Sequence, residues 1–413
     1  MRTSLDGSLL AGVVDRLSEV DAVRAARYPG DAGGRQPVHT CYVPADRVTG
    51  DVAAEWGAAA LATMVEHAPS AGTLAGLLDL PGELAEEVYA KVVAKLRREP
   101  VEDLRIDFED GYGLRTDEVE DADAVRCAAL VEEWAAPPPW VGIRFKSFDT
   151  RALLERGVRT LDLFVTALGR APVLTFPKVT DVAQVRVLTE LVQLLEERVG
   201  LPERSLRFEI QIETTQSIVD AKGRLAIPRF IAAGGGRVSG LHFGTYDYTA
   251  ACGLSAAEQH LAHAACDFAR HVMQVSAAGT GVRLSDGSSN VLPVGEQVPE
   301  AWRTHFGLVL RSLAHGFYQG WDMHPGQLVT RYAANYVYYL RHAAPDGARL
   351  RAYVDSHTGT ASSGVLDEPA TAQALAMSLR RALDCGAIEA ADVERLSGLS
   401  EVELAALARR ERP

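Results

Sequence analysis

Short runs of β-branched and other apolar residues recur along this chain and alternate with longer segments in which apolar residues are spaced three to four apart. This alternation is typical of βα units and of a parallel sheet. Eight such runs are present, at residues 38–43, 104–108, 141–145, 173–179, 206–212, 238–244, 281–285 and 319–323. Eight is the number of parallel strands that closes a TIM-type barrel, so the sequence predicts an α/β fold of the (β/α)8 class.

Helical periodicity is found in several of the intervals between these runs and continues beyond the last one. The clearest helical segments are 51–67, 84–98, 116–135, 181–199 and 256–278, followed by 326–344, 368–384 and 400–410. We therefore predict two parts. A barrel over residues 1–345 carries the site, and a helical extension over residues 346–413 caps the barrel or mediates oligomerisation.

Composition and charge narrow the class of function. The 42 basic and 55 acidic residues give a formal charge of -13, which argues against a nucleic-acid-binding surface. The five cysteines are far apart and form no C-x-x-C pair, which indicates neither a disulfide framework nor a zinc site and favours a reducing cytoplasm. The N-terminal segment is interrupted by acidic residues and the chain has no run of 18 apolar residues, so we expect no signal peptide and no membrane span.

Charged and polar residues follow the predicted strands at the point where each strand ends. They are Asp107, Glu109, Asp110, Arg144, Lys178, Glu213, Asp247, Asp286 and His324. A single carboxylate after a strand is as readily the N-cap of the next helix. Recurrence at so many strand ends instead predicts an active site, because TIM-barrel sites are built at the carboxyl ends of the strands.

Two of these carboxylates, Glu213 and Asp247, follow adjacent strands and have no Cys or His nearby. Oxygen ligands alone suit a hard cation, so we predict that they bind Mg²⁺ or Mn²⁺. Arg144 is then the candidate to hold the carboxylate or the developing enolate oxygen of a small anionic substrate.

The acidic cluster of Asp107, Glu109 and Asp110 is expected to balance the cation and Arg144 and to orient metal-bound water. His39 is a candidate general acid or base, pointing either into the barrel mouth or into its wall. The pair His260 and His263 lacks a third ligand, so we interpret both as ordinary helix residues. Signatures of serine hydrolases, P-loop enzymes and Rossmann dehydrogenases are missing from the sequence.

Over residues 38–385 the motifs resemble the HpcH/HpaI aldolase and citrate lyase β-subunit family of the phosphoenolpyruvate/pyruvate barrel superfamily. The segments that carry the resemblance, in the family's order, are RIDFEDGYG (105–113), IRF (143–145), FPKV (176–179), IETTQSI (212–218), FGTYDYTAACG (243–253), GFYQGWDMHPGQL (316–328) and SGVLDEPATAQAL (363–375). The resemblance implies that Glu213 and Asp247 bind Mg²⁺ and that Arg144 binds substrate. It also implies that Asp367 supplies a catalytic carboxyl group, which reaches a neighbouring subunit's site in relatives that form trimers or hexamers.

The chain departs from the family pattern at three places. Asp110 stands where the pyruvate aldolases usually have His, which favours the citrate lyase branch. That branch commonly has R-S before its first strand motif and G-K before I-H-P, whereas this chain has Val38–His39 and Gln319–Gly320. Use of coenzyme A therefore stays open.

These observations lead to one main expectation, a Mg²⁺- or Mn²⁺-dependent lyase or aldolase acting through an enolate of a pyruvate-like 2-oxo acid or an acetyl-derived unit. The alternatives are a Claisen-type acyl-CoA lyase or synthase, resembling malyl-CoA lyase or malate synthase, and a non-catalytic binding protein on a barrel scaffold. We expect a homo-oligomer, with Asp367 acting across a subunit boundary. The alternative for Asp367 is an N-cap of the helix that begins near Pro369.

Overall fold

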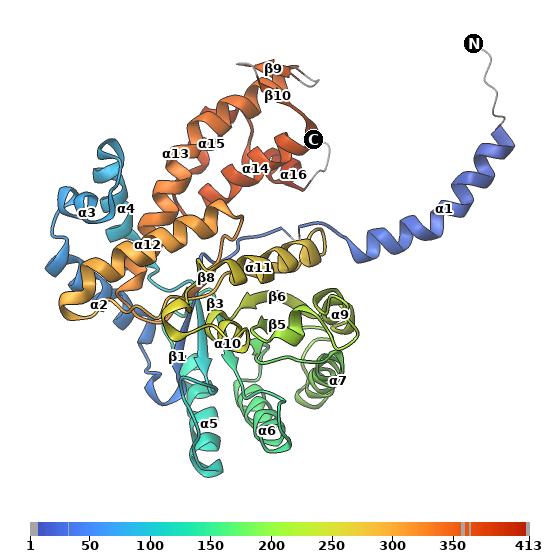
Figure 1. The fold of residues 1–413 in the computed structure, drawn as a ribbon, viewed down its shortest axis with the longest axis vertical. Helices are drawn as coiled ribbons and strands as arrows, with labels where there is room; N and C mark the ends of the chain where they lie inside the picture. Colours follow the sequence, from blue (N-terminus) through green and yellow to red (C-terminus); the bar gives the residue numbers. More distant parts are fainter. Residues whose placement is uncertain (1–6, 32, 357–359, 363–364, 410–413) are drawn as a thin grey trace.

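A computed structural model describes residues 7–31, 33–356, 360–362 and 365–409, and its centre is a ring of eight parallel strands (Figure 1). The strands are β1 (His39–Pro44), β2 (Asp103–Asp107), β3 (Trp140–Arg144), β4 (Val173–Phe176), β5 (Arg207–Ile212), β6 (Val238–Phe243), β7 (Arg283–Ser285) and β8 (Gly320–Asp322). They pair in the order β7-β6-β5-β4-β3-β2-β1-β8. A single bridge from Ser285 to Gln319 brings β7 back to the segment before β8, so the barrel is nearly closed. All eight predicted strands and the TIM-type fold are confirmed.

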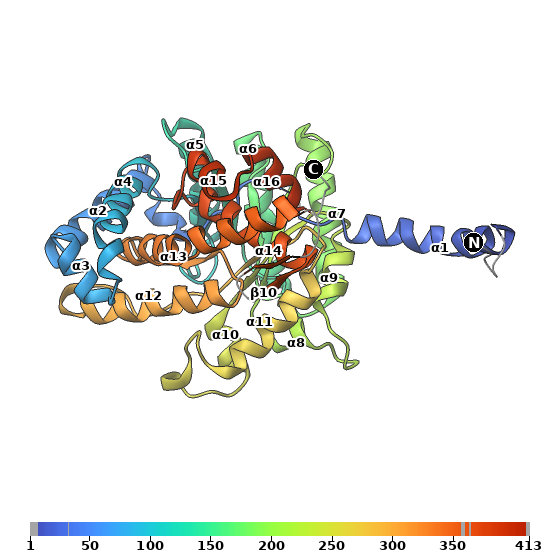
Figure 2. The same cartoon turned by 90° about the horizontal axis from the view of Figure 1, so that it is seen from above.

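Helices surround this ring (Figures 1 and 2). They are α2 (Val52–His67), α3 (Ala71–Leu78), α4 (Ala85–Arg98), α5 (Asp117–Glu133), α6 (Arg151–Leu168), α7 (Val182–Val199), α8 (Thr215–Ile218), α9 (Ile227–Ala233), α10 (Thr245–Ala251), α11 (Ala264–Ala277) and α12 (Val298–Ala314). The predicted helix over 256–278 is wrong in its first part. Helix α11 begins only at Ala264, because the His263 side chain accepts the backbone N–H of Ala265 and caps the helix there.

The C-terminal part is helical, as predicted, and is built on the 30-residue helix α13 (Gln327–Ser356), which spans about 45 Å at the usual rise of an α-helix. It packs against α2, α4 and α12 of the barrel and against α14 (Pro369–Asp384) and α15 (Ala390–Ser397). Helix α16 (Glu401–Ala408) follows, and a hairpin of β9 (Thr360–Ser362) and β10 (Val365–Asp367) lies beside the far end of α13 (Figure 1). The predicted boundary after residue 345 falls inside α13.

One helix lies apart from this body. Helix α1 (Gly7–Arg27) projects away from the barrel in both views (Figures 1 and 2). Its apolar side chains, among them Leu10, Val14 and Leu17, are exposed. None of the described helices combines the length and the apolar character needed to cross a lipid bilayer.

In the amino-terminal half of the barrel interior, buried charged side chains form ion pairs with one another. Arg105 on β2 has no exposed surface and forms an ion pair with Asp103 on its own strand. Its other nitrogens reach Glu209 Oε2 on β5 at 2.7 Å and Thr175 Oγ1 on β4 at 2.9 Å. Glu209 also lies 3.1 Å from His242 Nε2, so these groups form a polar layer that ties β2, β4, β5 and β6 together.

Candidate active site at the carboxyl ends of the strands

A cavity of about 470 Å³ opens at the carboxyl ends of the strands. Its walls come from the segments that follow β1, β2, β3, β5, β6, β7 and β8. The lining residues are Tyr42, Pro44, Arg47, Asp107, Asp110, Gly111, Arg144, Glu213, Gly244, Thr245, Tyr246, Asp247, Ser288, Trp321 and Met323. The structure therefore brings together four of the predicted site residues, Arg144, Glu213, Asp247 and Asp110. A fifth, Glu109, reaches the same charges through ion pairs described below.

Glu213 is the first residue after β5, and it is 2% exposed. Its Oε1 atom accepts the backbone N–H of Lys178 at 2.7 Å. Gly244, at the end of β6, lies so close that a Cβ atom there would sit 2.6 Å from Glu213 Oε2, so only glycine fits. Burial, together with the nearby charges of Asp247 and Glu109, raises the pKa of Glu213 to about 8.

Asp247 lies in the first turn of α10, directly beyond β6, and its side chain is 46% exposed. It faces the same cavity as Glu213, and its Oδ2 atom lies 3.7 Å from Lys178 Nζ. A buried carboxylate and an open carboxylate thus face each other across the cavity. This arrangement leaves room for solvent or a ligand between them.

Lys178, two residues beyond β4, is the positive centre of this cluster. Its Nζ atom lies 2.7 Å from both Glu109 Oε1 and Asp110 Oδ2. The pKa of its ammonium is raised far above the ordinary value, because the attraction of Glu213, Glu109 and Asp110 outweighs burial, which acts in the opposite direction. The position of Lys178 at a strand end is predicted from the sequence, but its place in this cluster is not.

Arg144, the last residue of β3, is held rigidly. Its Nε and Nη2 atoms donate to the two carboxylate oxygens of Asp107, each at 2.7 Å, and its Nη1 atom lies 3.3 Å from Glu109 Oε2. The guanidinium also lies over the rings of Tyr42, at 5.0 Å, and Trp321, at 6.0 Å. Asp107 thus fixes the orientation of the guanidinium through Nε and Nη2, and the third nitrogen, Nη1, faces Glu109.

The donor set fits Mg²⁺ or Mn²⁺. Four carboxylates, those of Glu109, Asp110, Glu213 and Asp247, surround one ammonium group, while Asp107 is matched by Arg144. Such an excess of oxygen donors, two of them, Asp110 and Asp247, partly exposed, is what a hard divalent cation with retained waters requires.

His39 is not brought to this site. It is the first residue of β1, at the opposite end of the strand from the cavity, and it has no exposed surface. Its Nε2 atom accepts the backbone N–H of Glu102 at 3.0 Å, so its proton resides on Nδ1, which donates to Asp322 Oδ2 at 2.8 Å. The expected alternative in which His39 lies in the barrel wall is the one observed, and the placement in the barrel mouth is wrong.

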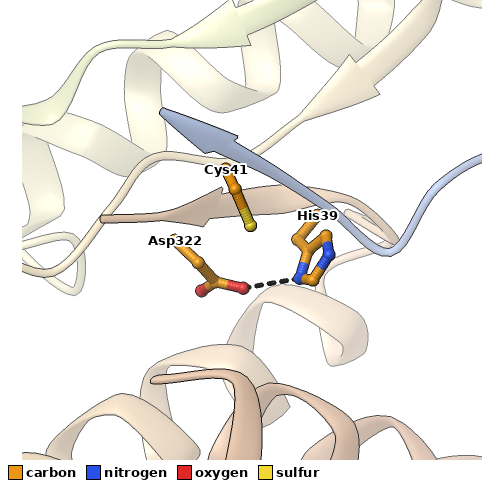
Figure 3. Close-up of side chains that lie close together, drawn as sticks. All are labelled: His39, Cys41 and Asp322. Atoms are coloured by element: carbon orange, nitrogen blue, oxygen red, sulfur yellow. Dashed lines mark hydrogen bonds and ion pairs between the residues drawn. The ribbon is translucent and has the colours of Figure 1, made fainter. Parts of the chain in front are cut away.

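His39, Cys41 and Asp322 do offer three ligand atoms within 4.8 Å of one another, as a metal site would (Figure 3). The Asp322 carboxylate, however, already accepts Arg331 Nη2 at 2.9 Å and lies 3.1 Å from His305 Nε2. Burial raises the pKa of the Cys41 thiol well above its ordinary value, which opposes formation of the thiolate that a metal needs. We interpret this cluster as a structural network that joins β1, β8, α12 and α13.

Two further strand-end residues, Asp286 and His324, have structural roles. Asp286, after β7, lies 3.0 Å from Arg270 Nη2 and accepts Ser312 Oγ at 2.5 Å, so it ties α11 and α12 to the barrel. His324, after β8, accepts the backbone N–H of Gly326 at 3.1 Å and shapes the turn into α13.

Asp367 is the last residue of β10, so its backbone belongs to the hairpin beside the far end of α13, and its side chain lies outside the described part of the structure (Figure 1). The alternative interpretation of Asp367 as a helix N-cap is wrong. Glu368 occupies the N-cap position of α14, because the helix begins at Pro369 and the strand continues through Asp367.

Comparison with known proteins identifies the family and the class of fold. A family model described as "Domain of unknown function (DUF6986)" matches residues 17–412, so this chain belongs to that family. No curated protein sequence matches it.

Among solved structures, the fold is similar to that of a citrate lyase from Burkholderia xenovorans LB400. The TM-score is 0.59 at 16% identity, and the match covers 89% of this chain and 98% of that chain. It is also similar to the protein CitE from Mycobacterium tuberculosis, solved with magnesium, acetoacetate and coenzyme A. There the TM-score is 0.52 at 18% identity, over 84% of this chain and 98% of that chain. The predicted resemblance to citrate lyase β-subunit proteins is confirmed for the fold.

Proposed function

We propose that this protein is a Mg²⁺- or Mn²⁺-dependent lyase or aldolase that makes or breaks a carbon–carbon bond through the enolate of a 2-oxo acid or an acetyl-derived unit. The observation that carries the proposal is the convergence of Glu213 and Asp247 on one cavity that also contains Arg144. Its fold, shared with a citrate lyase, supports the same class of chemistry. The five cysteines are unpaired, which suits the cytoplasmic location expected for such an enzyme.

Glu213 and Asp247 would hold the divalent ion, which when bound supplies positive charge beside a developing enolate oxygen. Arg144 is the substrate anchor. Because Asp107 fixes two of its nitrogens, the guanidinium is oriented before substrate arrives, and its third nitrogen, Nη1, which lies 3.3 Å from Glu109 Oε2, would be shared with a substrate carboxylate. Glu109 and Asp110 hold Lys178 and would accept hydrogen bonds from water around the ion.

Asp367 is proposed as the group that moves the proton, acting in the site of a neighbouring subunit. The hairpin that carries it lies beside the far end of α13, a helix about 45 Å long that begins just beyond β8 (Figure 1). A closed homo-oligomer, a trimer or a hexamer, would bring this hairpin to another barrel. Mixed Asp367→Ala and Asp247→Ala subunits should then recover part of the activity that each variant lacks.

An acyl-CoA substrate is the second candidate. The observation in its favour is the similar fold of the M. tuberculosis protein solved with coenzyme A. Calorimetric titration with acetyl-CoA separates the two candidates, since only the second requires binding of the thioester.

Enolate formation can be measured directly. With Mg²⁺ in D₂O, the protein should exchange the C3 protons of pyruvate or oxaloacetate for deuterium, observed as loss of the proton NMR signal, and EDTA should stop the exchange. Arg144→Lys should slow exchange by about 10² to 10³, because an ammonium cannot make the bidentate pair with Asp107 that orients Arg144 toward the substrate. Arg237→Lys is the matched control, since Arg237 makes a similar bidentate pair with Glu196, at 2.6 and 2.8 Å, away from the cavity. Equal rates for Arg144→Lys and the control would reject the anchor role. If neither 2-oxo acid exchanges and acetyl-CoA does not bind, the proposed function is wrong.

A further inference from the structure

Lys178 stands out because its backbone and its side chain both contact the candidate metal site. Its φ of 50° places it in the left-handed region, which is unfavourable for a residue other than glycine. In this conformation its N–H points at Glu213 Oε1, while its ammonium group lies among Glu109, Asp110 and Asp247. The left-handed backbone at this position therefore directs both the backbone N–H and the side-chain ammonium of Lys178 into one acidic cluster.

The distances around the ammonium are uneven. Glu109 and Asp110 are both at 2.7 Å, whereas Asp247 is at 3.7 Å and Glu213 is contacted only by the backbone N–H. The ammonium is thus bonded firmly to one side of the cluster and loosely to the other. The loose side consists of the two carboxylates that were predicted to bind the metal.

We propose that Lys178 is a built-in counter-ion that shares these carboxylates with the divalent cation and competes with it. This inference rests on the proposed metal site. Without the cation, the ammonium offsets the mutual repulsion of the carboxylates and keeps the site open and ordered. When the cation binds between Glu213 and Asp247, the ammonium gives up its contact with Asp247 and remains on Glu109 and Asp110.

Two consequences follow from the charges. A positive group a few ångströms from the bound ion weakens ion binding, so removing that group should tighten it. The same removal leaves the mutual repulsion of the carboxylates without this ammonium in the metal-free protein, which should therefore melt at a lower temperature. A residue that merely supports the fold would show the second effect without the first.

The test compares the wild-type protein with Lys178→Met, Lys178→Arg and Lys146→Met. Methionine removes the charge and keeps the backbone N–H that donates to Glu213, and arginine keeps the charge. Lys146 is the matched control, because it is a buried lysine bonded to Phe108 O at 2.7 Å and to Glu120 at 2.8 Å, but it has no ion pair with the described side chains of Glu109, Asp110 or Asp247. Mn²⁺ affinity is measured by calorimetry, and Tm is measured in EDTA and in saturating Mn²⁺.

We expect Lys178→Met to bind Mn²⁺ about tenfold or more tightly than wild type, with a lower Tm in EDTA and a larger rise in Tm on adding Mn²⁺. Lys178→Arg should bind as wild type does, and Lys146→Met should lower Tm equally with and without Mn²⁺. If Lys178→Met is too unstable for calorimetry, the Mn²⁺-dependent rise in Tm decides in its place.

Equal or weaker Mn²⁺ binding by Lys178→Met, with wild type still binding one ion, overturns the counter-ion role and leaves the proposed function intact. Binding by neither protein overturns the proposed function and this inference together.

Discussion

Both ends of the barrel contain buried charges, but the two ends differ in how those charges are matched. At the amino end, Arg105 lies between Asp103 and Glu209. In the barrel wall, Asp322, the last residue of β8, is met by Arg331 and two histidines. At the carboxyl end, four carboxylates face a single ammonium group beside an open cavity. A functional site is therefore indicated by unmatched charge of one sign that a ligand can reach, and the number of buried charges alone does not reveal it.

Breaking the matched network of the barrel wall should give the largest loss of stability. Asp322→Asn leaves the Arg331 guanidinium buried without a negative partner, because arginine stays charged inside a protein. We expect a loss of about 3–5 kcal/mol in the free energy of unfolding, measured by urea denaturation. Although burial opposes it, Arg331 with His305 and His39 holds the pKa of Asp322 well below its ordinary range, so the carboxylate is charged in the wild-type protein.

Mn²⁺ binding by this variant separates the network around Asp322 from the site at the carboxyl end. If Asp322→Asn stays folded at low temperature, it should bind Mn²⁺ with wild-type affinity. Loss of binding in the folded variant would mean that the His39 cluster belongs to the metal site after all.

A smaller change at the open end tests its geometry. Gly244→Ala introduces a Cβ atom that would meet Glu213 Cβ at 2.4 Å and Oε2 at 2.6 Å, so the Glu213 carboxylate must move. We expect Mn²⁺ affinity to fall by about tenfold or more, in line with the loss seen when groups that orient metal ligands are disturbed. Gly307→Ala on α12, which has open space around it, is the control. Unchanged affinity in Gly244→Ala would show that Glu213 is not a ligand in this position.

The smallest expected effect is a pH-dependent loss of stability when Glu99, at the amino end of the barrel, loses its charge. Glu99 pairs with Arg35 at 2.8 Å and with Lys95, and these partners outweigh burial and lower the pKa of Glu99 from 4.5 to about 2. A lowered pKa stabilises the folded state above the unfolded value of 4.5, and this stabilisation disappears as pH falls through about 2. Glu99→Gln should therefore cost about 1 kcal/mol near pH 7, since the pair is partly exposed, and almost nothing near pH 2.

Urea unfolding of both proteins across this pH range measures the difference. Glu87→Gln is the control, because Glu87 is half exposed and its contact with Lys91 is long, at 3.6 Å. This substitution should have no measurable effect on stability at any pH. A difference for Glu99→Gln that stays constant from pH 7 to pH 2 would contradict this interpretation.

The strands could be predicted from the sequence because strands of a parallel barrel are buried on both faces and read as short continuous apolar runs. Helices depended more on local detail. The start of α11 is set by a side-chain cap from His263, which apolar spacing does not report. Helices α6 and α12 were not predicted, although each packs an apolar face on the body.

The site was predictable to the extent that strand direction determines it. Arg144, Glu213 and Asp247 come at the ends of their strands and therefore meet. The same rule, applied to the run at 38–43, places His39 at the amino end, where the structure has it. The spacing of residues along the sequence could not show that the Asp107 carboxylate binds the Arg144 guanidinium, or that the Lys178 ammonium lies in the acidic cluster. Both contacts join side chains that come from different strands.

The most direct test of the account is calorimetric titration of the metal-free protein with Mn²⁺, carried out in parallel on wild type and Asp247→Ala. Wild type should bind one ion per chain. Asp247→Ala should bind none and should unfold at nearly the same temperature as wild type in EDTA, because this half-exposed side chain contributes little packing. Wild-type affinity in Asp247→Ala, or no binding by the wild-type protein, would contradict the assignment of the carboxyl end of the barrel as a metal-dependent active site.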